Sequence, residues 1–242
     1  MIKYKRHYIY TKFLIFILLI SSFLSCMARI EGELMEGGAV ELSLRTSLGP
    51  RTITLIRSLR TFAGDESEVL LLDGPAIGLS LEAMPGIGRA GIRNTSPSAL
   101  DGTIFISNIS DFLAEGDANR RFVVLNEAAQ NSSINVVLDR VTAPGLFLNL
   151  SPDILEYFHA IFAPAIQGDH ISVQEYLDLL TSIYGRPLAD EIEVGVILVQ
   201  ITFPRPIISV RGGTFSGRMA EFSIPLVDFL VLEQPLLYEV RW

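Results

Sequence analysis

Several segments of the chain alternate apolar and polar residues with a period of two, which is typical of a half-buried strand. The predicted strands are 30–34, 39–44, the extended segment 91–107, two arms of a hairpin within 120–141, 194–203, 219–224 and the C-terminal "LLYEVRW". Short turn sequences such as "MEGG" separate them and favour antiparallel pairing. Because the first and last segments are both strands, we expect them to pair in the centre of the sheet, with Trp242 inside the structure.

Other segments repeat apolar residues at helical spacing. The predicted helices are 51–62, ending at Gly64, then 75–84, 110–114, a helix capped by Ser151, a helix running from Ser172 to Gly185, and a short helix after Pro225. Glu175 stands three residues after Ser172, which is the spacing of a capping box. The third-last and second-last of these helices are expected to form a helical hairpin.

These elements predict an α+β fold: an antiparallel sheet with a helical hairpin and short helices packed on one face. Neither a long Gly, Ser or Pro stretch nor an internal repeat divides the chain. We therefore expect residues 26–242 to form a single α+β domain.

The N-terminal residues have the organisation of an export signal. Lys3, Lys5, Arg6 and Lys12 precede an apolar run from Phe13 to Leu24, and small Ser25 precedes the only cysteine, Cys26. About twelve apolar residues are too few to cross a bilayer, which needs roughly twenty. The pattern predicts a lipoprotein signal peptide over residues 1–25.

The sequence Phe23-Leu24-Ser25-Cys26 resembles the bacterial lipobox, with phenylalanine where leucine is commoner. The rest of the chain resembles uncharacterised spirochaete lipoproteins, most clearly in "GGTFSGRMAEFSIPLVDFLVLEQPLLYEVRW". The resemblance implies lipid on Cys26, including an acyl chain such as palmitate, and membrane anchoring that faces the periplasm or lies in the outer membrane. Two or three acyl chains, at about 0.8 kcal/mol per buried methylene, make such an anchor effectively permanent. The resemblance implies no catalytic residue.

Charge narrows the choice of partners. Without residues 1–25 the chain has 15 basic and 27 acidic residues, a net charge of −12, and every basic residue is arginine. An acidic surface disfavours nucleic acid, whose phosphates require neutralising cations. Lipid on Cys26 is the expected membrane contact, with a lipid or an envelope protein as partner.

No motif indicates a cofactor or a metal. "GIGRAG" (86–91) matches a dinucleotide fingerprint by letter, but a helix precedes it and turn-forming residues follow, so we expect a loop. "RGGTFSG" (211–217) is expected to be a turn or bulge between strands. His159 and His170 lack metal-ligand spacing. We predict neither catalytic nor metal residues here.

Apolar bulk on the two hairpin helices suggests a ligand groove between helices and sheet, although the same residues could simply fill a core. The candidates for an apolar ligand site are Phe158, Phe162, Tyr176, Leu180 and Tyr184.

The sequence thus predicts a non-enzymatic binding or structural module anchored by lipid in the cell envelope. The alternative is an envelope hydrolase that uses paired carboxylates. Its candidate carboxylates are Asp153 with Glu156, and Asp190 with Glu193. The acidic residues Asp190, Glu191 and Glu193 are otherwise expected to be a solvated turn.

Overall fold

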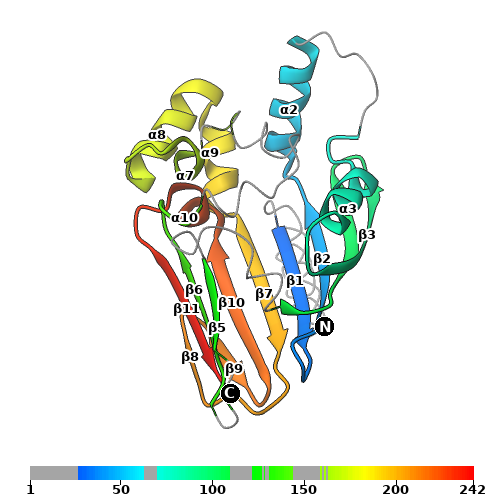
Figure 1. Ribbon diagram of the computed structural model, residues 1–242. Coiled ribbons are helices and arrows are strands. Elements are labelled where there is room, and N and C mark those ends of the chain that lie inside the picture. Colours follow the sequence, from blue (N-terminus) through cyan, green and yellow to red (C-terminus); the bar gives the residue numbers. More distant parts are fainter. Residues whose placement is uncertain are drawn as a thin grey trace, which may run out of the picture.

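The strands of the computed structural model form two sheets that face each other (Figure 1). The structure describes residues 27–62, 70–109, 122–126, 128, 131–143, 159, 161 and 163–242. The α+β class predicted from the sequence is confirmed, with mostly antiparallel sheets.

The larger sheet has seven strands in the order β3-β4-β2-β1-β7-β10-β9. Its strands are β1 (Met27–Leu34), β2 (Val40–Ser47), β3 (Ile87–Ser96), β4 (Ala99–Ile106), β7 (Val196–Thr202), β9 (Thr214–Ser216) and β10 (Met219–Pro225). Strand β1 lies in the centre, antiparallel to β2 and parallel to β7. All other neighbours in this sheet are antiparallel.

The smaller sheet has four antiparallel strands in the order β5-β6-β11-β8. They are β5 (Val123–Asn126), β6 (Ser133–Leu138), β8 (Ser209–Arg211) and β11 (Leu236–Arg241). The predicted pairing of the first and last strands is wrong, because β1 and β11 belong to different sheets. The expectation for Trp242 is confirmed, since its side chain is buried.

A glycine pair carries the chain from one sheet to the other. Gly212 and Gly213 connect β8 of the smaller sheet to β9 of the larger one. Gly212 has a φ of +81°, and a Cβ there would lie 2.5 Å from the carbonyl oxygen of Leu237. Only glycine tolerates this conformation and approach, so the turn predicted for "RGGTFSG" is confirmed as a connection between sheets.

Most of the described helices gather at one end of the strands, and the C-terminus lies at the other (Figure 1). The helices are α2 (Pro50–Phe62), α3 (Gly74–Glu82), α7 (Pro164–Gln167), α8 (Val173–Tyr184), α9 (Arg186–Glu193) and α10 (Leu226–Val231). Helix α3 instead packs beside β3. It approaches the strand closely at Gly78, where a Cβ would lie 2.7 Å from the carbonyl oxygen of Ala90.

Helix α8 begins and ends as its sequence predicts. The Ser172 hydroxyl accepts a hydrogen bond from the Glu175 amide, and the Glu175 carboxylate accepts one from the Ser172 amide at 2.8 Å. These two bonds satisfy amides that the first helical turn leaves unpaired. Gly185, with a φ of +87°, follows the last residue of the helix.

Two local predictions are wrong. "GIGRAG" is not a loop, because β3 begins at Ile87 and continues through it. The glycines there read as turn formers in the sequence, but they allow a flat edge against which a helix and a strand pack. Asp190, Glu191 and Glu193 lie in helix α9 and not in a turn, and Glu191 is buried.

The predicted helix at 110–114, the one capped by Ser151 and the end at Gly64 fall outside the described residues.

Candidate functional site

An apolar cavity of about 320 Å³ lies between the two sheets. Its walls come from strands of both sheets and from short connections between them. The lining residues are Leu34, Val40, Leu42, Ile106, Ile109, Phe122, Val123, Ile134, Val136, Val199, Ile201, Phe203, Phe222, Ile224, Tyr238, Glu239 and Val240. This volume falls within the range of about 300–1,000 Å³ that is usual for ligand sites.

The period-two pattern of the strands places these side chains on the inner faces. On β7, Val199, Ile201 and Phe203 alternate with residues that face away from the smaller sheet. On β11, Tyr238 and Val240 face them from the opposite wall. Every second residue of these strands is therefore apolar and turned inward, which gives the cavity its chemistry.

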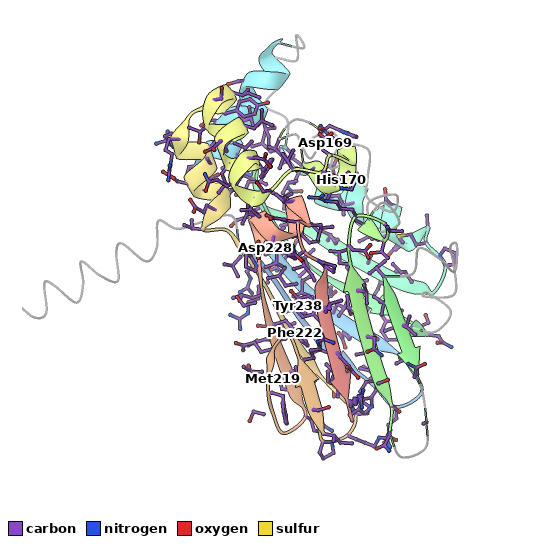
Figure 2. The ribbon with its side chains drawn as sticks, turned by 90° about the vertical axis from the view of Figure 1, so that its left-hand side faces the viewer. Asp169, His170, Met219, Phe222, Asp228 and Tyr238 are labelled. Carbon is purple, nitrogen blue, oxygen red and sulfur yellow. The ribbon has the colours of Figure 1, made fainter. Side chains whose placement is uncertain are left out.

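Aromatic contact joins the two walls. The rings of Phe222, on β10, and Tyr238, on β11, meet edge to face with centroids 5.3 Å apart. Figure 2 shows the two side chains between the strands, with Asp228 nearer the helical end. Burial, and secondarily the Asp228 carboxylate, raise the pKa of the Tyr238 phenol. Tyr238 is therefore neutral at physiological pH and adds a hydroxyl, not a charge.

Glu239 is the one acidic residue among the described lining residues, and its carboxylate is paired with the Arg241 guanidinium. Only 22% of the Glu239 side chain is exposed. With this charge already paired, the cavity favours an apolar occupant over a polar one.

A second cavity of about 410 Å³ lies at the end of the strands opposite to the helices. It is bordered by the β1–β2 turn, the β5–β6 connection, the residues after β7 and the C-terminus. Its lining residues are Leu34, Met35, Glu36, Gly37, Ala128, Ser132, Pro204, Arg205 and Trp242. Arg205 donates from Nη2 to the Ser132 hydroxyl at 2.9 Å. This second cavity, unlike the first, has charged groups in its wall.

The residues predicted for an apolar site lie elsewhere. Tyr176 and Leu180 are fully buried in a cluster formed by α8, α9 and α10, and Tyr184 packs against that cluster. None of these three lines the cavity between the sheets. Phe158 and Phe162 are outside the described side chains, so the site predicted on the hairpin helices stays a prediction.

Tyr176 shows how tightly that helical cluster is packed. Its hydroxyl donates to the carbonyl oxygen of Ile161 at 3.0 Å, and burial raises the pKa of Tyr176 well above its ordinary value. Tyr184 has its pKa raised by burial as well.

Cys26 also lies outside the described residues, but its neighbour is informative. Strand β1 begins at Met27, opposite Ser47 of β2 and Val196 of β7. Helix α2 begins three residues after Ser47, and Val196 follows α9 closely. The chain therefore enters the central strand at the helical end of the fold.

The buried carboxylate of Glu191 has a structural task. Glu191 accepts hydrogen bonds from the amides of Arg51 and Thr52 at 2.8 and 2.9 Å, and from the Thr52 hydroxyl at 2.8 Å. Gly49, at the N-cap of α2, has no side chain that could accept these bonds. A Cβ at Gly49 would collide with the Glu191 carboxylate. Sequence reasoning missed this cap because its two halves are about 140 residues apart.

The other candidate carboxylates and histidines do not converge. Asp190 pairs with Arg186 on the surface of α9, and Glu193 is exposed. His159 is exposed, and exposed His170 places Nδ1 2.9 Å from Nη1 of Arg140 (His170 is labelled in Figure 2). No group of three or more potential metal ligands occurs within the described part of the chain. Asp153 and Glu156 lie outside it.

Arg140 ties the loop before α8 to α10. Besides His170, its guanidinium donates to the carbonyl oxygens of Ile171 at 2.7 Å and Val231 at 3.2 Å. This arrangement fixes the helical end of the fold to strand β6, which ends just before Arg140.

Comparisons with known proteins show little. No protein family model and no curated sequence matches the chain. The folded domain of the Mycobacterium tuberculosis protein LppM is similar with a TM-score of 0.40 and 8% identity, covering 90% of this chain and 89% of that one. Yeast LTA4 hydrolase, solved with bestatin, is similar with a TM-score of 0.32 and 9% identity, covering 90% of this chain and 28% of the enzyme. Neither score is high enough to establish a common fold.

Among the described helices, none is both long and apolar enough to cross a bilayer.

Proposed function

We propose that this chain is a lipid-anchored cell-envelope protein whose folded part binds an apolar chain between its two sheets. The cavity of about 320 Å³ with almost wholly apolar walls carries the proposal. The lipobox sequence ending at Cys26 supports the anchor. The protein then acts by binding, and its surroundings are the periplasm or the outer membrane.

The geometry of the anchor supports a defined orientation. If Cys26 carries lipid, only one peptide bond separates it from Met27, the first residue of the central strand. The helical end of the fold then lies next to the bilayer. The second cavity is at the other end of β1, roughly 23 Å away at about 3.3 Å per residue. Its opening therefore faces away from the membrane that holds the protein.

The apolar cavity also explains why strands, and not the hairpin helices, are the better place for a ligand. The helical cluster contains Tyr176, Leu180 and Leu230 with no exposed surface, which leaves no room there. The sheets are held apart by the edge-to-face pair Phe222–Tyr238. A flexible hydrocarbon chain fits between such walls because dispersion contacts need no particular hydrogen bonds.

Two measurements test the proposal. Metabolic labelling with palmitate should mark the wild-type protein in its host, and Cys26→Ala should abolish both labelling and membrane retention. Native mass spectrometry of the protein extracted from host membranes should show a non-covalent lipid. Val199→Phe, which fills the cavity, should remove that lipid, while Val124→Phe, on the exposed outer face of β5, should retain it. Unlabelled wild-type protein without co-purified lipid contradicts the proposal.

A further inference from the structure

The two cavities share one wall. Leu34, the last residue of β1, lines both of them. Phe203 lines the apolar cavity and Trp242 lines the second cavity, and their rings are in contact with centroids 4.7 Å apart at an angle of 45°. Three side chains thus separate an apolar space from a polar one at the end of the strands remote from the helices.

The second cavity presents charges of both signs. Glu36, in the turn between β1 and β2, supplies a carboxylate, and Arg205, just after β7, supplies a guanidinium. These two are the charged residues among its described lining residues. The Arg205 guanidinium is oriented by its bonds to the Ser132 hydroxyl and to the carbonyl oxygen of Ala128.

The Ser132 support is itself rigid. Its backbone exchanges two hydrogen bonds with Trp242, from the Ser132 amide at 2.9 Å and from the Trp242 amide at 3.0 Å. Ser132 is buried and donates from its hydroxyl to the carbonyl oxygen of Ala128 at 3.1 Å. A guanidinium held in this way is pre-organised for a planar or tetrahedral anion.

From this arrangement we infer that the ligand is a single-chain zwitterionic amphiphile, with its hydrocarbon chain in the apolar cavity and its head group in the second cavity. The inference rests on the proposed function, because it needs the chain to lie between the sheets. A phosphate faces Arg205, and an ammonium group faces Glu36.

Charge complementarity selects this head group. A purely anionic head would be attracted by Arg205 and repelled by Glu36, and a purely cationic head would meet the reverse. An uncharged head would gain nothing from either ion. A head with both signs is the charged type for which neither side chain is repulsive.

The size of the apolar cavity selects the number of chains. At about 320 Å³ it lies at the lower end of the range for ligand sites, which suits one hydrocarbon chain better than two. To pass between the cavities, the chain displaces Leu34 or turns the Phe203 ring away from Trp242. Binding should therefore change the surroundings of Trp242.

Trp242 is the only tryptophan in the chain and provides the readout. The full chain is reconstituted in phosphatidylglycerol vesicles, which contain no ammonium group. It is titrated with a short-chain lysophosphatidylethanolamine below its micelle concentration. Lysophosphatidic acid and a monoacylglycerol of the same chain length serve as comparison ligands. The zwitterionic ligand should shift Trp242 emission at the lowest concentration.

Single substitutions separate the contributions. Arg205→Gln should weaken both phosphate ligands about tenfold and leave the monoacylglycerol unchanged. Arg205→Lys, which keeps the charge, should recover part of that loss and controls for a disturbed fold. Glu36→Gln should weaken the zwitterionic ligand alone. Glu41→Gln, an exposed carboxylate on β2, is the matched control and should change none of the three.

The outcomes distinguish the two proposals. Equal binding of all three ligands, unaffected by Glu36→Gln and Arg205→Gln, overturns the head-group inference and leaves the proposed function intact. If no ligand binds, or if Val199→Phe binds all three as the wild type does, the proposed function fails and the inference fails with it.

Discussion

Removal of the Glu191 carboxylate should destabilise the fold far more than removal of any exposed carboxylate nearby. Glu191 is 8% exposed and accepts three hydrogen bonds at the N-terminus of α2. Glu191→Ala leaves the Arg51 and Thr52 amides without their acceptor in a site that is largely closed to water. The substitution also removes a negative charge from the positive end of the helix dipole.

The magnitude follows from these contacts. A hydrogen bond to a charged group contributes about 1.5–3 kcal/mol, and three bonds to one carboxylate are not independent. Truncation of one partner in a buried charged interaction typically costs about 3–5 kcal/mol. We expect Glu191→Ala to lower the free energy of unfolding by about 3–5 kcal/mol. Glu191→Gln, which keeps an acceptor oxygen without the charge, should fall between this variant and the wild type.

Urea unfolding followed by far-ultraviolet circular dichroism measures the change. Glu193→Ala, at an exposed position of the same helix, is the control and should stay within about 0.5 kcal/mol of the wild type. Amide hydrogen exchange adds a local test, because Arg51 and Thr52 should lose protection first. A Glu191→Ala protein with the wild-type midpoint and unchanged protection in α2 would show that this cap contributes nothing to stability.

Three further expectations concern single residues. The Ser172 amide, and then its hydroxyl, hold the pKa of Glu175 below its ordinary value of 4.5, so the stability from the capping box is present above that pH and is lost as the pH falls through the lower folded-state pKa. Glu175→Gln should accordingly be less stable than the wild type at neutral pH and equal to it in strong acid, as measured by urea unfolding at each pH. Burial raises the pKa of Tyr176 above its ordinary value of 10.0, so its ionisation, followed by absorbance near 295 nm, should occur only on unfolding, and stability should fall as the pH rises above 10; Tyr176→Phe should reduce that alkaline loss and cost about 1 kcal/mol at neutral pH. Gly212→Ala should lower the midpoint of thermal unfolding by several degrees, because a Cβ is strained at this φ and collides with the Leu237 carbonyl; Gly217→Ala, which has a similar φ but nothing within 4 Å of its Cβ, separates the collision from the strain.

Local signals in the sequence predict most of the described elements. The capping box of Ser172 and Glu175 fixes the start of α8, and Gly185 fixes its end, because each acts through neighbours within a few residues. The alternation within 194–203 likewise predicts β7. Such patterns identify an element without reference to the rest of the chain.

Interactions between distant residues are not visible in the same way. The sequence gives no sign that Glu191 caps a helix that begins at Pro50, because its letters read as part of an acidic cluster. The assignment of β11 to a second sheet depends on the connection through Gly212 and on α10, both of which reverse the chain between layers. A pattern of period two states that a strand has an inner face, but not which sheet it faces.

The same limit explains the site. The inward residues of β7 and β11 are predicted as strand residues, but a cavity appears only when two sheets are known to face each other. Bulky aromatic residues on the predicted hairpin helices attract attention in the sequence, whereas Tyr176 is the best-packed of them. Aromatic content along a helix therefore indicates a filled core at least as often as a ligand site.

Strand β1 connects the two parts of the proposed function. Its first residue follows Cys26 directly, and its last residue, Leu34, lines both cavities. A strand in the centre of a seven-stranded sheet, hydrogen-bonded on both sides, cannot shift without breaking two ladders. If Cys26 is lipidated, the distance from the bilayer to the polar cavity is thus set by the fold and not by a flexible linker. A ligand then reaches the cavity from a partner or from a surface beyond the anchoring bilayer, because the helical end, and not the cavity, lies against that bilayer.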